Sequence, residues 1–236
     1  MLNHTKKIKE IYEEIQKRLF YMIPEKWDKL YLYSSVIDMP KNIKTGELYF
    51  YYIPKGILKK RPINVYEIPN KFNIDETQYL KLVELLYDKI KKLREEFRKS
   101  ESQELWSNIT ISIEGTKFKV DYNYDNLKKN DFNSYERHVL WRIKYLKVTP
   151  EQCTKEEKEV VKKYASLPKK IIRHETYETG IYIRDVKNLV EYNTDGFDKI
   201  REIEETKKEV NENKKKNQIL LSAEEIEKIR KNRQNK

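Results

Sequence analysis

WSNITISIEGTKFKVDYNYD, residues 106 to 125, is the stretch that decides the fold. Its first half places Ile109, Ile111 and Ile113 at alternate positions, with polar residues between them. Beyond a short turn at residues 114 to 116, the second half repeats the alternation with Phe118, Val120, Tyr122 and Tyr124. Because successive side chains of a strand point to opposite faces, the pattern predicts an antiparallel hairpin with one apolar face. Such a face needs helices to cover it, but the alternation by itself indicates scaffold and no particular chemistry.

Segments with helical periodicity on both sides of the hairpin predict the helices that cover this face. Residues 75 to 100 predict a long helix whose apolar residues, at steps of three and four, form one stripe: Tyr79, Val83, Leu86, Ile90, Leu93 and Phe97. Residues 5 to 22 and 134 to 146 predict two further helices, and a charged helix is expected near 154 to 165.

Additional strands are expected before and after the central hairpin. Residues 29 to 38 are apolar on both faces and predict an interior strand, which pairs with residues 47 to 53 as a hairpin. Three prolines between 54 and 74 leave room only for a short edge strand at residues 63 to 66. Strand-like residues recur at 171 to 172 and 180 to 184.

The pattern as a whole predicts an α+β fold, in which two or three helices cover a mostly antiparallel sheet of about four to six strands. A boundary is expected at Ser166-Leu167-Pro168. Residues 1 to 166 would form the α+β domain and fold by themselves, because the long apolar stripes precede Pro168. Residues 167 to 236 would form a charged, mainly helical C-terminal extension, in which Ser222 and Glu225 make a capping box for the last helix.

Composition favours a folded, cytoplasmic protein. Apolar residues are only 38%, but 18 tyrosines and 7 phenylalanines provide area to bury. No apolar run approaches the roughly 20 residues of a membrane span, and the single Cys153 fits a reducing compartment. The net charge is +11, with 29 basic and 21 acidic residues up to position 150 and 21 and 18 after it. Bases and acids are interleaved throughout, which is typical of solvated helix faces.

Catalytic, cofactor and metal signatures are not expected in this sequence. The five glycines are too far apart for a phosphate-binding loop. Asp121, Asn123 and Asp125 match the start of a calcium loop, but Asn126 and Phe132 stand where glycine and glutamate are needed, so a strand edge is favoured. His138, His174 and Cys153 lack partners at ligand or catalytic spacing. An enzyme would have to rely on a carboxylate group formed by Glu114, Asp121 and Asp125.

Tyrosines next to basic residues form the best candidate for a partner-binding surface. We expect exposed tyrosines beside a basic loop, because Tyr and Arg are favoured as binding anchors: Tyr51, Tyr52, Lys59, Lys60 and Arg61. The same surface supports an alternative function, in which a basic, tyrosine-rich patch binds single-stranded nucleic acid and loses affinity steeply with salt. The edge of an ordinary tyrosine-rich sheet would give the same pattern.

Several short stretches, in this order, resemble the YezG-type antitoxins over about residues 5 to 165. They are IPEKW at 23 to 27, LREEF at 93 to 97, KFKVDY at 117 to 122 and RIKYL at 142 to 146. This family comprises small cytoplasmic immunity proteins of Gram-positive bacteria. The resemblance implies a non-enzymatic role, in which the chain binds and blocks a cognate toxin, often a nuclease exported by a type VII secretion system. The family offers no fixed functional residues to transfer.

Overall fold

The computed structural model describes residues 5–56, 61–99, 104–168 and 173–181, all within one compact unit. Its helices are α1 Lys6–Tyr21, α2 Ile68–Phe72, α3 Glu76–Arg98, α4 Ser134–Leu146 and α5 Lys155–Ser166. Its strands are β1 Trp27–Ser35, β2 Ile37–Asp38, β3 Lys44–Thr45, β4 Leu48–Pro54, β5 Ile63–Asn64, β6 Asn108–Glu114, β7 Lys117–Asn123 and β8 His174–Gly180. Short 3₁₀ turns are η1 Pro40–Asn42, η2 Val65–Glu67, η3 Leu127–Lys129 and η4 Pro150–Gln152.

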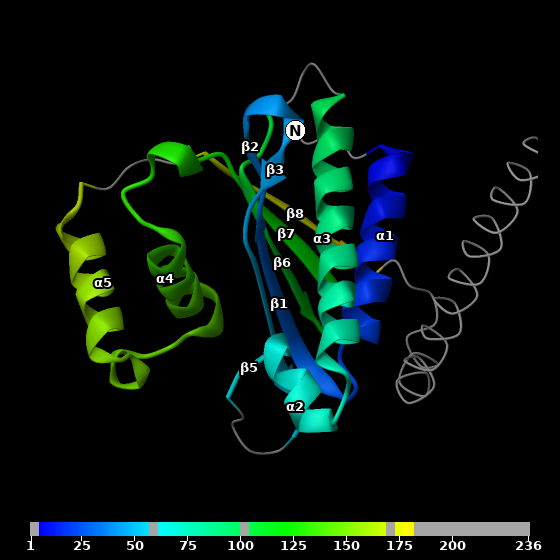
Figure 1. Cartoon of the computed structure of the whole chain (residues 1–236), viewed down its shortest axis with the longest axis horizontal. Helices are drawn as coiled ribbons and strands as arrows, with labels where there is room; N and C mark the ends of the chain where they lie inside the picture. Colours follow the sequence, from blue (N-terminus) through cyan, green and yellow to red (C-terminus); the bar gives the residue numbers. More distant parts are fainter. Residues whose placement is uncertain (1–4, 57–60, 100–103, 169–172, 182–236) are drawn as a thin grey trace, which may run out of the picture. The chain divides into compact units, whose positions relative to one another are not determined.

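An antiparallel six-stranded sheet, in the order β5-β4-β1-β6-β7-β8, is the centre of the fold (Figure 1). The predicted central hairpin is confirmed as β6 and β7, with Ile111 opposite Val120. Gly115 has a φ of 56° in the turn, a backbone conformation that glycine adopts without steric cost. The α+β class is therefore confirmed.

Helices α1 and α3 cover one face of this sheet. Tyr12 of α1 lies 5.4 Å from the ring of Phe118, and Phe97 of α3 lies 5.3 Å from the ring of Tyr122. The predicted stripe is fully or almost fully buried at each of its positions: Tyr79, Val83, Leu86, Ile90, Leu93 and Phe97. Burying each large apolar side chain contributes roughly 1.5–3 kcal/mol, so this layer supplies much of the stability. Thr5 and Asp75 are the N-caps of the two helices.

Helix α4 covers the opposite face, and α5 packs against α4 (Figure 1). Asn133 and Glu136 form a capping box that starts α4, and Thr154 and Glu157 do the same for α5. Trp141 donates a hydrogen bond of 3.0 Å from Nε1 to the hydroxyl of Thr110 on β6, which anchors α4 to the sheet. The two helices predicted at 134 to 146 and near 154 to 165 are confirmed.

Three local predictions need correction. The interior strand ends at Ser35, and residues 37–38 pair instead with residues 44–45 in a separate two-stranded sheet. The short edge strand stops at Asn64, because this side chain caps η2 and turns the chain into α2, which the sequence did not predict. Strand-like residues were expected at 171–172 and 180–184, but the described strand in this region, β8, runs from 174 to 180.

The sequence pattern did not give the bounds of β8, because aliphatic residues do not alternate with polar ones between His174 and Gly180. The register of this strand comes from pairing along the whole of β7. Residues 171–172 and 182–184 lie outside the described residues, as does the predicted C-terminal helical extension from 182 onward.

The predicted domain boundary at residue 166 falls before β8, which is a strand of the six-stranded sheet. A chain that ends there would lack this edge strand. Whether residues 1 to 166 fold by themselves therefore stays a prediction. No described helix combines the length and the apolar character needed to cross a membrane.

Candidate partner-binding surface

The residues predicted to bind a partner do not form one exposed patch. Tyr51 is 8% exposed and its hydroxyl lies 3.0 Å from Nε2 of His138 on the α4 face. Tyr52 is 0% exposed and donates a hydrogen bond of 2.6 Å to Glu25. Neighbouring residues of a strand point to opposite faces, and both faces of β4 are covered, so the expected exposure of these tyrosines is wrong.

The basic part of that prediction is left open by the structure. Arg61 has a side chain that is 73% exposed, and it forms an ion pair of 2.8 Å with Glu67. Lys59 and Lys60 lie outside the described residues. A role of these three residues in binding stays a prediction.

The tyrosines instead build an aromatic cluster between the sheet and α4. Rings of Tyr49 and His138 stack with centroids 4.1 Å apart, and Tyr33 stacks on Tyr49 at 4.9 Å. Burial is the main cause that lowers the pKa of His138 to about 4, with the charge of Arg142 adding to it. His138 is therefore neutral near pH 7 and serves packing and a hydrogen bond with Tyr51.

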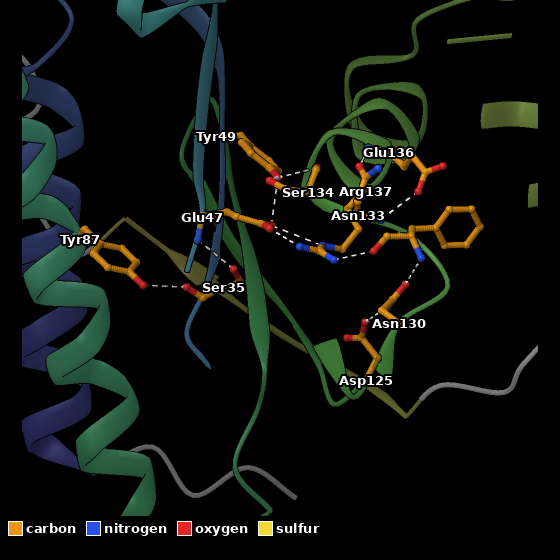
Figure 2. A network of polar contacts seen from close by, with 11 residues as sticks. Ser35, Glu47, Tyr49, Tyr87, Asp125, Asn130, Asn133, Ser134, Glu136 and Arg137 are labelled. Atoms are coloured by element: carbon orange, nitrogen blue, oxygen red, sulfur yellow. Dashed lines mark hydrogen bonds and ion pairs between the residues drawn. The ribbon is translucent and has the colours of Figure 1, made fainter. Parts of the chain in front are cut away.

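A polar network fixes the start of α4 against β4 (Figure 2). Arg137 forms an ion pair with Glu47 and donates to the carbonyl oxygen of Phe132 at 2.6 Å. Tyr49 donates to Glu47 at 2.9 Å and to the carbonyl oxygen of Ser134 at 3.0 Å. Because the Arg137 and Glu47 side chains are mostly buried, each needs the other to compensate its charge.

Asp121, Asn123 and Asp125, which match the start of a calcium loop, have structural roles. Asp121 and Asn123 lie in β7, which confirms a strand, but β7 pairs on both sides and Asp121 is 2% exposed, so the expected strand edge is wrong. Asp125 accepts hydrogen bonds from Asn108 at 2.7 Å and from Asn130 at 3.1 Å, so its carboxylate closes the loop before α4 (Figure 2).

A cavity of about 350 Å³ lies on the α4 face beside the end of α4. Lys119, Lys144, Lys147 and His174 line it, together with the carboxylates of Glu114 and Asp121. Each carboxylate is engaged: Glu114 pairs with Lys29 at 2.6 Å, and Asp121 accepts from Thr176 at 2.7 Å and pairs with Lys119 at 3.1 Å. Asp125 is not among the lining residues. The three proposed catalytic carboxylates are thus not brought together, and the lysines favour an anionic group of a partner.

A second exposed feature is the hairpin tip, residues 39 to 43, between β2 and β3. Met39 and Ile43 are 43% and 58% exposed and are joined by a backbone hydrogen bond of 2.8 Å from Met39 N to Ile43 O. The sequence contained a signal for it, since apolar residues flank a Pro-Lys-Asn turn between two strands.

Ion pairs join this hairpin to α3. Asp38 accepts hydrogen bonds of 2.8 Å from Arg94 and from Arg98, and Lys44 forms an ion pair with Glu95. Burial acts to raise the pKa of Asp38, but the two arginines outweigh it and hold this pKa below its ordinary value. Gly46 allows the close approach at the hairpin base, because a side chain there would place its first carbon 1.9 Å from the carbonyl oxygen of Ser35.

Exposed apolar side chains on a fixed backbone are typical of interaction surfaces. The hairpin tip and the lysine-lined cavity are thus two described features that fit a protein partner.

Comparison with known proteins gives one consistent result. The sequence model of a family described as "Immunity protein YezG-like" matches residues 8–162. Immunity protein YezG of Bacillus spizizenii strain W23 is 32% identical over 151 residues, which are 64% of this chain and 89% of the relative. Immunity protein YezG of Bacillus subtilis strain 168 is 29% identical over 161 residues, covering 68% of this chain and 100% of the relative. The type VII secretion system protein EsaG of Staphylococcus aureus is 28% identical over 153 residues, covering 64% and 88%.

Proposed function

We infer the function from one premise: the chain belongs to the YezG-like immunity protein family. We propose that it binds a cognate bacterial toxin and neutralises it by forming a stoichiometric complex, without catalysing a reaction. The observation that carries this proposal is the family match over residues 8–162, which spans strands β1 to β7 and the helices that cover them. The chain would act in the cytoplasm of the cell that produces the toxin.

The toxin's class is a finer part of the proposal. EsaG is named as a type VII secretion system protein, which supports a toxin exported by such a system. The resemblance seen in the sequence adds that this toxin is a nuclease. Direct binding of nucleic acid by the chain itself is the weaker alternative, because the tyrosines expected to stack on bases are buried in the aromatic cluster.

We propose the hairpin tip as the principal contact with the toxin. Met39 and Ile43 already expose apolar area, and the ion pairs of Asp38 and Lys44 hold them in place before binding. A contact that is ordered in the free protein loses little conformational entropy in the complex. Arg61, with Lys59 and Lys60, remains a second proposed contact, on the sequence-based argument.

The net charge of the chain leads to an expectation about its rate of association with the toxin. A net charge of +11 steers the protein toward an acidic surface, and such steering raises the association rate at low salt. We therefore expect the association rate with the toxin to fall as ionic strength rises, while the dissociation rate changes little.

Co-expression with the toxin encoded beside the gene tests the function. We expect protection of the cells and co-purification of a complex with equal amounts of both proteins. Because inhibition by occupancy needs one inhibitor per toxin, protection should be lost when the toxin is in excess. Full toxicity and no complex, with a folded protein, would contradict the antitoxin proposal.

Variants then locate the contact. Replacing both Met39 and Ile43 with serine should weaken the complex more than tenfold while the melting temperature is unchanged, because both side chains are exposed. The matched control replaces Leu80 and Leu85 of α3, which are also exposed apolar residues, and should bind as the parent does. Arg61→Ala tests the sequence-based site. A complex weakened by Arg61→Ala and not by the tip variant would move the contact to β5.

A further inference from the structure

The two edges of the six-stranded sheet are protected very differently. β5 at one edge has only two residues, follows Pro62 and leads directly into η2 and α2. β8 at the other edge has seven residues and pairs along its whole length with β7 (Figure 1). Three devices that natural sheets use to block edge pairing, namely proline, lysine and a bulge, are absent between His174 and Gly180, where Glu175 and Glu178 are the acidic residues.

The direction of the free backbone groups follows from the ladder. The amide of Ile181 donates to the carbonyl oxygen of Thr116 at 3.0 Å, next to the pair of Lys117 and Gly180. Antiparallel ladders alternate, so the odd-numbered residues of β8 direct their backbone groups to β7. The N–H and C=O groups of the even-numbered residues point away from the sheet: His174, Thr176, Glu178 and Gly180. All four of these residues are exposed.

We propose that β8 pairs with β8 of a second copy of this chain, antiparallel and about a two-fold axis at Tyr177. This register uses all seven residues and places the outward groups of Thr176 opposite those of Glu178. It sets Glu175 against Thr179 as well, so that no two like charges face each other directly. The strand is thus complementary to itself, which is what an isologous two-fold interface requires.

The proposal goes beyond the shared immunity domain, because β8 begins at residue 174 and the family match ends at residue 162. In the dimer the two sheets become one continuous twelve-stranded sheet. Antiparallel pairing keeps equivalent faces on the same side, so the two α4 faces and their cavities lie together on one side. A toxin complex would then contain two copies of each protein.

A proline at an outward-facing amide separates this interface from the fold itself. In Glu178→Pro the N–H that points to the second copy is lost, but the bonds from β8 to β7 are kept, since they come from odd-numbered residues. Proline also restrains Tyr177 to the extended conformation that it already has in the strand. Glu178→Ala removes the same side chain and keeps the amide, which makes it the matched control.

Sedimentation of the full chain without toxin gives the test. The parent and Glu178→Ala should have twice the mass of the 28.8 kDa chain, and Glu178→Pro should have the mass of one chain with an unchanged melting temperature. A parent that sediments as one chain at high concentration, or a dimer that persists in a folded Glu178→Pro, would overturn the proposal.

Amide hydrogen exchange on the parent decides the matter if Glu178→Pro does not fold. The amides of Thr176 and Glu178 should exchange slowly in concentrated solution and quickly after dilution, whereas the amide of Tyr177, which faces β7, should stay protected. Equal exchange of Thr176 and Glu178 at both concentrations would rule out the paired edge. Because no toxin is present, the result is independent of the proposed antitoxin function.

Discussion

The two faces of the central sheet are held by different interactions. The face under α1 and α3 is filled by aliphatic and aromatic side chains, with Leu86 and Ile90 fully buried at its centre. The face under α4 contains tyrosines, a neutral histidine and the ion pair of Arg137 with Glu47. Apolar packing is non-directional and depends on volume, whereas the α4 face depends on the positions and charges of individual polar atoms. Volume changes should therefore damage the first face, and charge or pH changes the second.

The largest effect is expected from Ile90→Ala or Leu86→Ala on the α3 face. Either change removes fully buried atoms and leaves a cavity, which should reduce the free energy of unfolding by about 2–5 kcal/mol. Denaturant titration measures it. Leu85→Ala on the exposed side of the same helix is the control and should stay within about 0.5 kcal/mol of the parent. An unchanged midpoint for Ile90→Ala would mean that α3 does not pack through this stripe.

A smaller effect is expected from breaking the ion pair on the α4 face. Arg137→Met leaves the mostly buried Glu47 carboxylate without its cation, and the free energy of unfolding should fall by about 1–3 kcal/mol. The double variant with Glu47→Gln should recover part of this loss, because no uncompensated charge then remains. If the double variant is no more stable than Arg137→Met, the uncompensated charge of Glu47 is not the cause of the lost stability.

The difference between the faces also explains what the sequence could predict. The α3 stripe and the β6–β7 hairpin were predictable, because periodic burial of aliphatic residues leaves a periodic pattern in the sequence. Helix α4 was predictable from Asn133 and the apolar residues after it. The burial of Tyr51 and Tyr52 could not be predicted from the sequence. Tyrosine has an apolar ring and a polar hydroxyl, so it fits either a surface or a hydrogen-bonded core. The positions of α4 and β5 show that His138 and Asn64 supply the partners of Tyr51.

The bounds of β8 and the exposure of the hairpin tip could not be predicted for a related reason. The bounds of the strand at 174 to 180 are set by the complete ladder that β7 offers, which is a tertiary interaction. At Met39 and Ile43 the residue type predicts burial, but the bonds of Asp38 to α3 hold the turn in solvent. The binding proposals rest on these two regions, in which the local sequence pattern and the final structure disagree.

The smallest effect is a pH dependence confined to the α4 face. The pKa of His138 is lowered to about 4 by burial and by Arg142, although Glu157 and Glu47 oppose this shift. An unfolded histidine has a pKa of about 6.5, so between these values the unfolded chain binds a proton that the folded chain refuses. The contribution of His138 to stability is therefore complete above about pH 6.5 and is lost progressively as the pH falls toward 4.

His138→Gln isolates this contribution, because the variant has the same carboxylates as the parent and their titration cancels in the difference. The free energy of unfolding should differ between the two proteins by a constant amount above about pH 6.5. Below that pH the parent should lose stability faster, and the difference should shrink until about pH 4. Denaturant titrations of both proteins across this range measure it. A difference that does not change with pH would show that His138 titrates normally in the folded protein, and that the aromatic cluster admits its charged form.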